Sequence, residues 1–231
     1  TGVTVHLGTG TATGLAGIAN FENVRGGDGN DGLTGGDGNN LLAGGVGKDT
    51  LSGGKGDDML YGEEGNDSLL GGDGDDLLDA GGGVNVSKGG AGDDVYAFLA
   101  NGQTDQASEL AGEGGDHLDF GYVASGSLVL ALKAAGLLEV SGAGITVQAQ
   151  TLAALDSVTG GSGTDRFVFD DGASIGGILD GGGIPDYGVD FANTLDYAAY
   201  TTQVIVDISS AGLPGAVGTA TGTLGVKNLM H

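Results

Sequence analysis

The 231-residue sequence has no cysteine, no tryptophan and only two prolines, and aromatic residues make up just 5% of it. Without cysteine the chain can form no disulfide, no thiol nucleophile and no thiolate metal site. The scarcity of proline and the lack of a strict G-X-Y period exclude a proline-rich linker and a collagen helix. No stretch approaches 18 uncharged apolar residues, so we expect no membrane-spanning helix.

Basic residues are also scarce: seven Lys and Arg stand against 31 Asp and Glu, which gives a formal charge of −24. A surface this acidic repels nucleic-acid phosphates and anionic membranes, and it attracts cations. A solubilising acidic surface or a disordered chain would have the same charge balance. The arrangement of the acidic residues therefore has to decide between these interpretations.

Glycine, by contrast, supplies 53 residues, and many of them belong to a nine-residue repeat. From Gly26 to Ala97 the chain divides into eight units without a slip in register, with the pattern G-G-x-G-x-D-x-U-x, where U is a large apolar residue. Position 2 is glycine in all units but the fifth, which has Glu63: Gly27, Gly36, Gly45, Gly54, Gly72, Gly81 and Gly90. Position 4 is always glycine: Gly29, Gly38, Gly47, Gly56, Gly65, Gly74, Gly83 and Gly92. Position 6 carries a carboxylate or an amide: Asp31, Asn40, Asp49, Asp58, Asp67, Asp76, Asn85 and Asp94. Position 8 is apolar except in the seventh unit: Leu33, Leu42, Leu51, Leu60, Leu69, Leu78, Ser87 and Tyr96.

Each position of the repeat has a physical role. Glycines at positions 1, 2 and 4 allow a positive φ in a tight turn and bring backbone carbonyls together. Position 6 supplies a hard oxygen ligand at the end of that turn. Positions 7 to 9 form a short strand in which alternation buries position 8 alone. Two units therefore close a coil of about 18 residues, and the strands of neighbouring coils lie about 4.8 Å apart.

The stacked turns need more than this thin core to hold them. One buried leucine cannot offset the entropy lost when nine residues are fixed. Turns on the same side stack, so we expect Asp31 near Asp49 and Asn40 near Asp58. Ca²⁺ takes six to eight oxygen ligands at about 2.3–2.6 Å, which carboxylates and glycine carbonyls of two turns can supply. The repeat therefore predicts calcium ions between the coils.

The nonapeptides resemble the RTX repeats of proteins that bacterial type I systems secrete, and the resemblance covers residues 26–97. It implies an all-β fold, a right-handed parallel β-roll or β-solenoid, with Ca²⁺ between turns i and i+2. The carboxylate ligands that it implies are Asp31, Asp49, Asp58, Asp67, Asp76 and Asp94, with Asn40 as a neutral ligand. The turn carbonyls that it implies belong to Gly27, Gly29, Gly36, Gly38, Gly45, Gly47, Gly54, Gly56, Gly65, Gly72, Gly74, Gly90 and Gly92. Because Asn85 and Glu63 depart from the pattern, we expect four to six ions in residues 26–97.

Further units flank this block. Residues 160–168 form an isolated unit that adds Asp165 as a predicted ligand, and residues 111–119 form a degenerate one that adds Asp116. Alternating apolar runs predict strands of a continuing solenoid at 128–132, 137–140, 145–147 and 155–158, whereas 104–110 reads as a short helical turn. We divide the chain into N-terminal strands (1–25), the nonapeptide roll (26–98), a degenerate solenoid (99–159) and a second RTX-like unit with the start of another module (160–231).

The head and tail of the chain repeat one another about 200 residues apart. Residues 1–7 match 202–208, Gly10-Thr11-Ala12-Thr13-Gly14 matches 218–222, and 17–21 matches 225–229. This arrangement resembles the large modular RTX surface proteins and adhesins. We expect the sequence to be slightly more than one period of such a protein.

The remaining motifs in the sequence give no indication of a catalytic site. No H-E-x-x-H or G-x-S-x-G occurs, the three histidines are scattered, and no helix is expected after the glycine-rich strings. The pairs Asp57-Asp58, Asp75-Asp76 and Asp93-Asp94 recur at the repeat period, which indicates metal binding rather than glycosidase chemistry. Threonine rows at 9–13 and 219–223 suit strands or, alternatively, an ice-binding face. Asp170-Asp171 with the insertion 184–190 forms either another calcium site or a polar loop.

We therefore expect a non-catalytic, calcium-dependent structural module of a secreted or cell-surface bacterial protein: an adhesin stalk, a surface-layer piece or a filament. Its expected partners are calcium ions and neighbouring modules or head-to-tail copies. Two alternatives stay open: an accessory folding and secretion module of a lipase, protease or epimerase, and a module that binds a glycan or surface.

Overall fold

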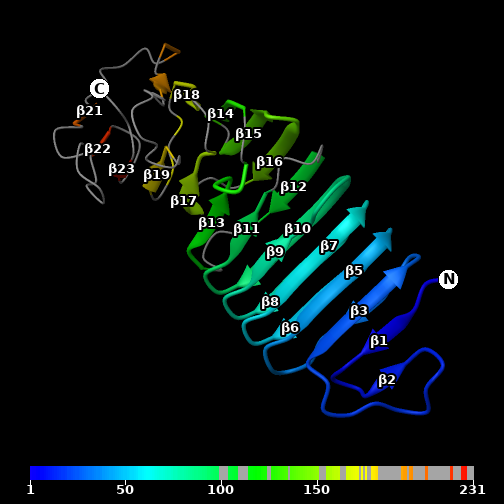
Figure 1. Cartoon of the computed structure of the whole chain (residues 1–231). Coiled ribbons are helices and arrows are strands. Elements are labelled where there is room, and N and C mark those ends of the chain that lie inside the picture. The colour runs from blue at the N-terminus through cyan, green and yellow to red at the C-terminus, as the bar shows by residue number, and fades with distance from the viewer. Residues whose placement is uncertain are drawn as a thin grey trace, which may run out of the picture.

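The computed structural model describes residues 1–98, 104–108, 114–123, 126–134, 136–150, 155–161, 165–171, 173, 175, 178–181, 194–196, 198–199, 206–207, 219–220 and 225–227. These residues form strands and turns, with no helix among them. Figure 1 shows the strands stacked along one axis from the N-terminal end in blue to the later strands in green and yellow. Among the described residues, nothing helical has the length and apolar character to cross a membrane.

The strands form two long sheets. Sheet A has twelve strands, in spatial order β2 (Thr11–Ala12), β1 (Thr4–His6), β4 (Gly32–Thr34), β6 (Thr50–Lys55), β8 (Ser68–Asp73), β10 (Val84–Ala91), β12 (Thr104–Ser108), β16 (Ile145–Gln150), β15 (Leu137–Gly142), β14 (Leu128–Leu132), β18 (Arg166–Phe169) and β20 (Thr194–Asp196). Sheet B has nine, in order β23 (Gly225–Lys227), β19 (Ile178–Asp180), β17 (Leu155–Thr159), β13 (Asp116–Asp119), β11 (Val95–Ala97), β9 (Leu77–Asp79), β7 (Met59–Gly65), β5 (Leu41–Gly47) and β3 (Asn23–Asp28). A separate pair joins β21 (Val206–Asp207) to β22 (Thr219–Ala220).

In the nonapeptide block the chain alternates between the sheets, so each strand pairs in parallel with the strand 18 residues away. Leu33 lies beside Leu51 in sheet A, and Leu42 lies beside Leu60 in sheet B. This pairing confirms the all-β parallel roll and its coil of two nonapeptides. The position-8 leucines of both sheets point between them and are at most 2% exposed.

At the end of the leucine core, a small and a large side chain follow one another at position 8. Position 8 is Ser87 in the seventh unit and Tyr96 in the eighth, and both are buried. The Tyr96 hydroxyl accepts a hydrogen bond from the Gly89 N–H at 2.5 Å and donates to the Ser108 carbonyl at 3.2 Å. The phenol thus occupies the space that the short serine leaves, and its polar end is satisfied as a buried tyrosine requires.

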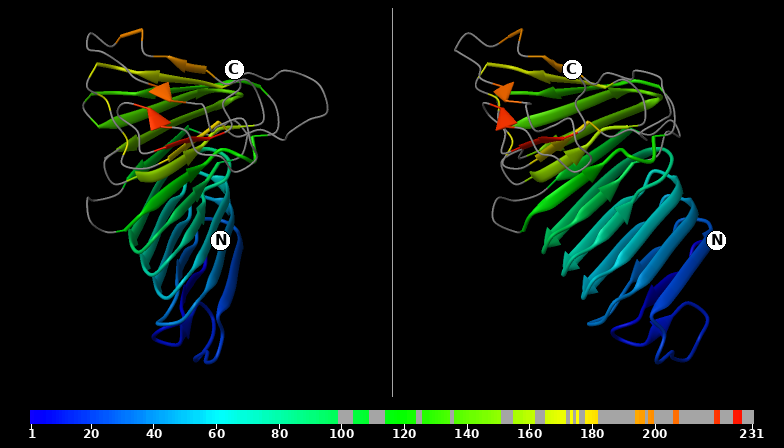
Figure 2. Two further views of the ribbon diagram at one scale, coloured as in Figure 1. Left: turned by 90° about the vertical axis from the view of Figure 1, so that its left-hand side faces the viewer. Right: turned by 60° about the vertical axis from the view of Figure 1, so that its left-hand side comes forward.

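Beyond the nonapeptides the roll widens, as the green and yellow strands of Figure 2 show. Leu118 of β13 lies directly beside Val158 of β17, 40 residues later. Between these two strands the chain forms β14, β15 and β16, an antiparallel meander within sheet A. The expected strands are therefore present, but they are not successive coils of a simple solenoid.

Two other expectations meet the structure differently. The helical turn expected at 104–110 is wrong where the structure describes it, because residues 104–108 form β12, parallel to β10 and β16. The head–tail repeat is supported where both copies are described. Val5 pairs with Ala12 and His6 with Thr11, and the matching residues Val206 and Asp207 pair with Ala220 and Thr219. Most of the tail copy and the insertion at 184–190 lie outside the described residues.

Candidate metal sites between the stacked turns

The coil period stacks the turns into two rows, one on each side of the roll. The first row carries Asp31, Asp49, Asp67 and Asn85 at position 6, and the second carries Asn40, Asp58, Asp76 and Asp94. From the second turn of each row onward, the Oδ1 atom at position 6 accepts the backbone N–H of position 6 in the preceding turn. The Asp31 N–H donates to Asp49 at 2.7 Å, for example, and the Asp58 N–H donates to Asp76 at 2.8 Å.

The second carboxylate oxygen of these aspartates has no such partner. The Oδ2 atoms of Asp31, Asp49, Asp58, Asp67 and Asp76 are buried and accept no hydrogen bond from the residues that the structure describes, and each of the five residues is at most 4% exposed. A buried carboxylate oxygen without a hydrogen bond or a counter-charge is costly. Five of them at a regular spacing indicate positions where a cation completes the structure.

Glycine at position 1 leaves room beside these oxygens. A Cβ on Gly53 would lie 2.1 Å from Asp58 Oδ2 and 2.7 Å from the carbonyl oxygen of Gly71 in the next turn. A Cβ on Gly26 would meet Asp31 and Gly44 at the same two distances. A carboxylate oxygen and a carbonyl oxygen from neighbouring turns therefore converge on one point in each coil, and only glycine keeps that point open.

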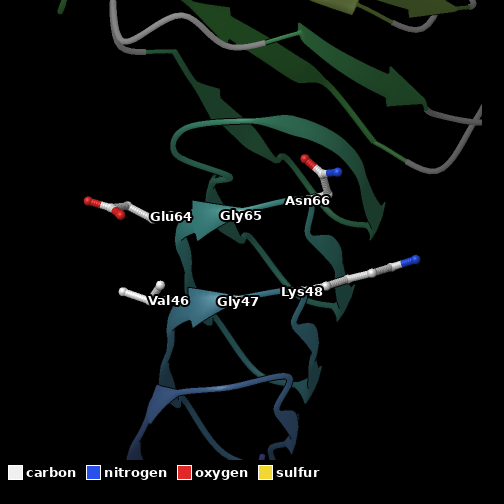
Figure 3. Close-up of a pocket in the computed structure, with 6 residues that line it drawn as sticks. All are labelled: Val46, Gly47, Lys48, Glu64, Gly65 and Asn66. Atoms are coloured by element: carbon white, nitrogen blue, oxygen red, sulfur yellow. The ribbon is translucent and has the colours of Figure 1, made fainter.

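Most of the other glycines of the turn are needed for their backbone conformation. Gly36 at position 2 and Gly38 at position 4 do not have a positive φ, so the expected conformation is wrong for these two. At position 2, Gly45 and Gly72 have φ of +115° and +132°, and at position 4, Gly47 has +149°, a region that residues with a side chain rarely adopt. Position 4 also stacks too closely for a side chain, since a Cβ on Gly65 would lie 1.4 Å from the Gly47 carbonyl oxygen. Figure 3 shows these two glycines stacked, with their neighbours pointing outward on either side of a shallow surface hollow. The expectation of a positive φ at position 1 is wrong, because those glycines are required by packing alone.

The two asparagines modify the rows in different ways. Asn85 Oδ1 accepts the Asp67 N–H at 2.8 Å, but its Nδ2 donates to Asp105 Oδ1 at 2.8 Å. Asn40 turns its Oδ1 to the Gly36 N–H at 2.7 Å and donates Nδ2 to Glu22 Oε2 at 3.0 Å. At each of these two turns an uncharged amide replaces the carboxylate. Its Nδ2 group donates a hydrogen bond to an acidic side chain, where an aspartate would have a second oxygen.

Sequence reasoning missed Glu22 and Asp105 as members of these rows. Glu22 stands 18 residues before Asn40, so the coil period contained a signal for it. Asp105 stands 20 residues after Asn85 and becomes its neighbour only through the pairing of β10 with β12. No nonapeptide register reaches a residue at that spacing.

The two predicted ligands beyond the block are buried as well. Asp116 continues the second row, because its Oδ1 accepts the Asp94 N–H at 3.1 Å across 22 residues. Asp165 instead accepts the Leu128 N–H at 2.8 Å, at the start of β14. The structure therefore brings Asp116 together with the nonapeptide aspartates and places Asp165 against the meander.

Burial raises the pKa of these carboxyl groups. The pKa of Asp67 and that of Asp76 rise to about 6, chiefly by desolvation, while the backbone N–H bond opposes the shift and the carboxylate of the preceding turn adds to it. Desolvation also raises the pKa of Asp165 to about 6, and it raises those of Asp49 and Asp58. The rows are thus unfavourable places for negative charge until a cation compensates it.

The donor set fits a hard cation. Within the described ranges, no three or more His, Cys, Asp or Glu side chains gather into one cluster. Two stacked turns of one row offer up to two carboxylates, so an ion between them would take its remaining ligands from backbone carbonyls. An all-oxygen, flexible shell of this kind suits Ca²⁺, whereas Mg²⁺ demands near-ideal octahedral geometry.

Comparison with known families agrees with this geometry. The family model of the RTX calcium-binding nonapeptide repeat matches four times, at residues 25–60, 52–86, 61–96 and 151–175. No curated protein matches the chain. The first three matches cover the two rows of turns, and the fourth covers Asp165. The chain therefore carries RTX calcium-binding nonapeptide repeats, and its stacked turns are calcium-binding structural elements.

Proposed function

We propose that this chain is a structural module of a secreted bacterial protein that folds when it meets extracellular calcium. The observation that carries the proposal is the series of five buried Oδ2 atoms that have no hydrogen-bond partner within the described part of the chain. Residues that serve only solubility would keep both carboxylate oxygens in water. Here one oxygen ties each turn to its neighbour, and the other faces a carbonyl of the next turn.

The rows support four to six ions in residues 26–97. Four pairs of stacked turns contribute two aspartates each: Asp31 with Asp49, Asp49 with Asp67, Asp58 with Asp76, and Asp76 with Asp94. Two further pairs contribute one aspartate and one asparagine, Asn40 with Asp58 and Asp67 with Asn85. Ligand charge tunes calcium affinity, so we assign the tight sites to the first group and the weak ones to the second.

Calcium acts through linkage, because it binds the stacked turns and not the unfolded chain. When bound, the ion supplies the positive charge and the coordination bonds that join two turns. Without it, the repulsion among the carboxylates of this acidic chain, whose formal charge is −24, keeps the nonapeptide block extended, which suits export from a low-calcium cytosol. In calcium-rich surroundings the same residues close the coils.

The role that this mechanism supports is structural rather than catalytic: an adhesin stalk, a surface-layer piece or a filament segment outside the cell. The shared register of the β1–β2 and β21–β22 pairs supports modules that follow one another head to tail. Open sheet ends of a roll favour such end-to-end contact with a neighbouring module.

Far-UV circular dichroism during a calcium titration from EDTA tests the proposal, with magnesium as the control. We expect a transition from coil to β structure at sub-millimolar to millimolar Ca²⁺ and none at equal Mg²⁺. A β spectrum that does not respond to EDTA would show that the fold forms without metal, and the calcium mechanism would be wrong.

A further inference from the structure

The outward face of sheet B between β3 and β13 carries two neighbouring columns of side chains, one apolar and one partly charged. Positions 7 and 9 of the repeat point outward from the sheet, because position 8 points into the core. Position 7 forms an apolar column across four neighbouring strands: Leu41, Met59, Leu77 and Val95. Leu41 is 36% exposed and Met59 is 47% exposed. A contiguous exposed apolar column is a typical feature of an interaction surface.

The neighbouring column, at position 9, is ordered by charge and size. Along β3, β5, β7, β9, β11 and β13 it reads Arg25, Ala43, Tyr61, Asp79, Ala97 and Asp119. A cation begins the column, an anion ends it, two small residues lie symmetrically inside, and a phenol stands beside a carboxylate in the centre. When the column is placed against a second copy that runs in the opposite order, each residue faces one of complementary charge or size.

We propose that this face binds the same face of a second copy, with a twofold axis parallel to the strands between β7 and β9. Such an axis keeps each column opposite itself and reverses the order of the strands. It exchanges β7 with β9, β5 with β11, and β3 with β13. The contact is therefore isologous, like most contacts between identical subunits.

The exchange brings apolar side chains of the two copies together. Met59 lies opposite Leu77 of the second copy, and Leu41 lies opposite its Val95. Ala43 lies opposite Ala97, so the two lowest points of the column meet. Both alanines are less than 9% exposed, so the contact between the two faces is made by the larger side chains around them.

The polar pairs of the interface follow the same exchange. The Tyr61 hydroxyl lies opposite the Asp79 carboxylate of the second copy and can donate a hydrogen bond to it. Asp79 is held in place, since its Oδ1 accepts the Gly81 N–H at 3.1 Å. Arg25 lies opposite Asp119. The Arg25 side chain is 70% exposed, and its Nη2 also contacts Glu63 Oε2 at 2.6 Å.

The area of the face sets the strength of the association. Six strands about 4.8 Å apart and three residues wide give a patch of about 300 Å² on each copy. The total is well below the roughly 1,600 Å² of a standard interface. One pair of chains therefore binds weakly, with a dissociation constant on the order of 0.1 mM or above. Added salt strengthens the pair, because it screens the repulsion between two acidic molecules.

Sedimentation equilibrium in calcium, at concentrations from about 0.02 to about 1 mM, tests whether the pair forms. The test variant is Met59→Glu, and the matched control is Leu70→Glu, which places the same charge on the outward face of sheet A, where Leu70 is 42% exposed. We expect dimerisation by the wild type and by Leu70→Glu, and at least a tenfold weaker association of Met59→Glu. Circular dichroism confirms that all three are folded, which separates this test from that of the calcium mechanism. A wild type that stays monomeric, or equal association of all three, would overturn the proposal.

Cross-linking tests the register, and the cysteine-free sequence makes it specific. Chains with Leu41→Cys and chains with Val95→Cys are mixed with a bifunctional thiol reagent whose reach matches the ~10 Å spacing of stacked sheets. We expect mixed dimers in excess over both like pairs, because like residues are displaced by three strands. Preferential coupling of Leu41→Cys to Met59→Cys, or no preference at all, would contradict an axis between β7 and β9.

Discussion

Between residues 24 and 98 each coil of the roll buries one position-8 side chain from each sheet, whereas between residues 104 and 181 the coils bury several. In the first region the six leucines are flanked by rows of buried aspartates. In the second, β14, β15 and β16 add buried aliphatic residues to sheet A, and the Phe98 and Phe120 rings stack at 4.6 Å where the regions meet. The same two-sheet roll thus buries rows of carboxylates beside a thin core in one part and a larger apolar volume in the other.

The comparison shows what calcium replaces. A narrow roll has little interior, and under the proposed function its turns carry the ligands for a cation that joins the coils. A wider roll has room for large side chains such as Phe167 and Phe169, both fully buried, and depends less on an ion. We therefore expect the two regions to respond differently to metal, mutation and pH.

Removal of calcium gives the largest expected difference. We expect amides of β5–β9 to lose at least 100-fold in hydrogen-exchange protection in EDTA, which corresponds to about 2.7 kcal/mol, the linkage energy of one site with ligand at 100 times its dissociation constant. Amides of β14–β16 should keep most of their protection. Mass spectrometry of peptic fragments measures both regions in one sample. Equal loss in both would show that the two regions unfold as one unit.

Truncation of a core side chain in each region separates them further. Phe167→Ala should cost about 3–5 kcal/mol, and Leu60→Ala about 2–5 kcal/mol, because both leave a cavity among fully buried neighbours. Urea unfolding in calcium measures these losses. Only Leu60→Ala should also raise the calcium concentration needed for folding, as measured by circular dichroism. An equal shift for Phe167→Ala would break the distinction between the regions.

Substitution of a single ligand gives a smaller effect. Asp76→Asn should raise the calcium midpoint on the order of tenfold, because it removes one charged oxygen from two sites and introduces a donor like that of Asn85. Asp75→Asn is the matched control, since Asp75 is exposed and its Oδ1 accepts the Asp93 N–H at 2.9 Å, as an amide oxygen also can. Similar shifts from both variants would argue for a general charge effect rather than a specific ligand.

The pKa shifts predict how the metal-free roll depends on pH. In the folded roll, burial raises the pKa of Asp67 and that of Asp76 to about 6, above the ordinary aspartate value of 3.8. The folded state therefore binds more protons between these values, and its stability falls as pH rises through this window. In EDTA we expect more β structure at pH 4 than at pH 7. Calcium affinity should show the opposite trend, and a metal-free spectrum independent of pH would contradict the burial of these charges.

The smallest expected effect concerns Glu63, which stands where the repeat has glycine. Its φ is +72°, a strained conformation for a residue with a side chain. Glu63→Gly removes that strain and loses only an exposed ion pair with Arg25, so we expect a gain of about 0.5–1 kcal/mol in thermal unfolding. Glu64→Gly, at the next and unstrained position, serves as the control and should give no gain.

Much of the roll could be predicted from the sequence because its information is local. A nine-residue period fixes a turn and a strand, and two units fix the pairing of Leu33 with Leu51 and of Asp31 with Asp49. The chemistry of position 6 then predicts the cation. These conclusions need no knowledge of distant contacts, since each coil touches only coils one step away in the repeat.

Only the tertiary structure decided what happens where the period ends. The alternating runs that become β14, β15 and β16 would look the same as three coils or as one meander, because alternation fixes which side chains are buried and not which strand lies beside which. Asp105 and Asp116 likewise join the rows through spacings of 20 and 22 residues. The sequence by itself determined the calcium-binding roll, because its period repeats the same contacts, while the wider apolar core depends on pairings between distant strands that only the fold selects.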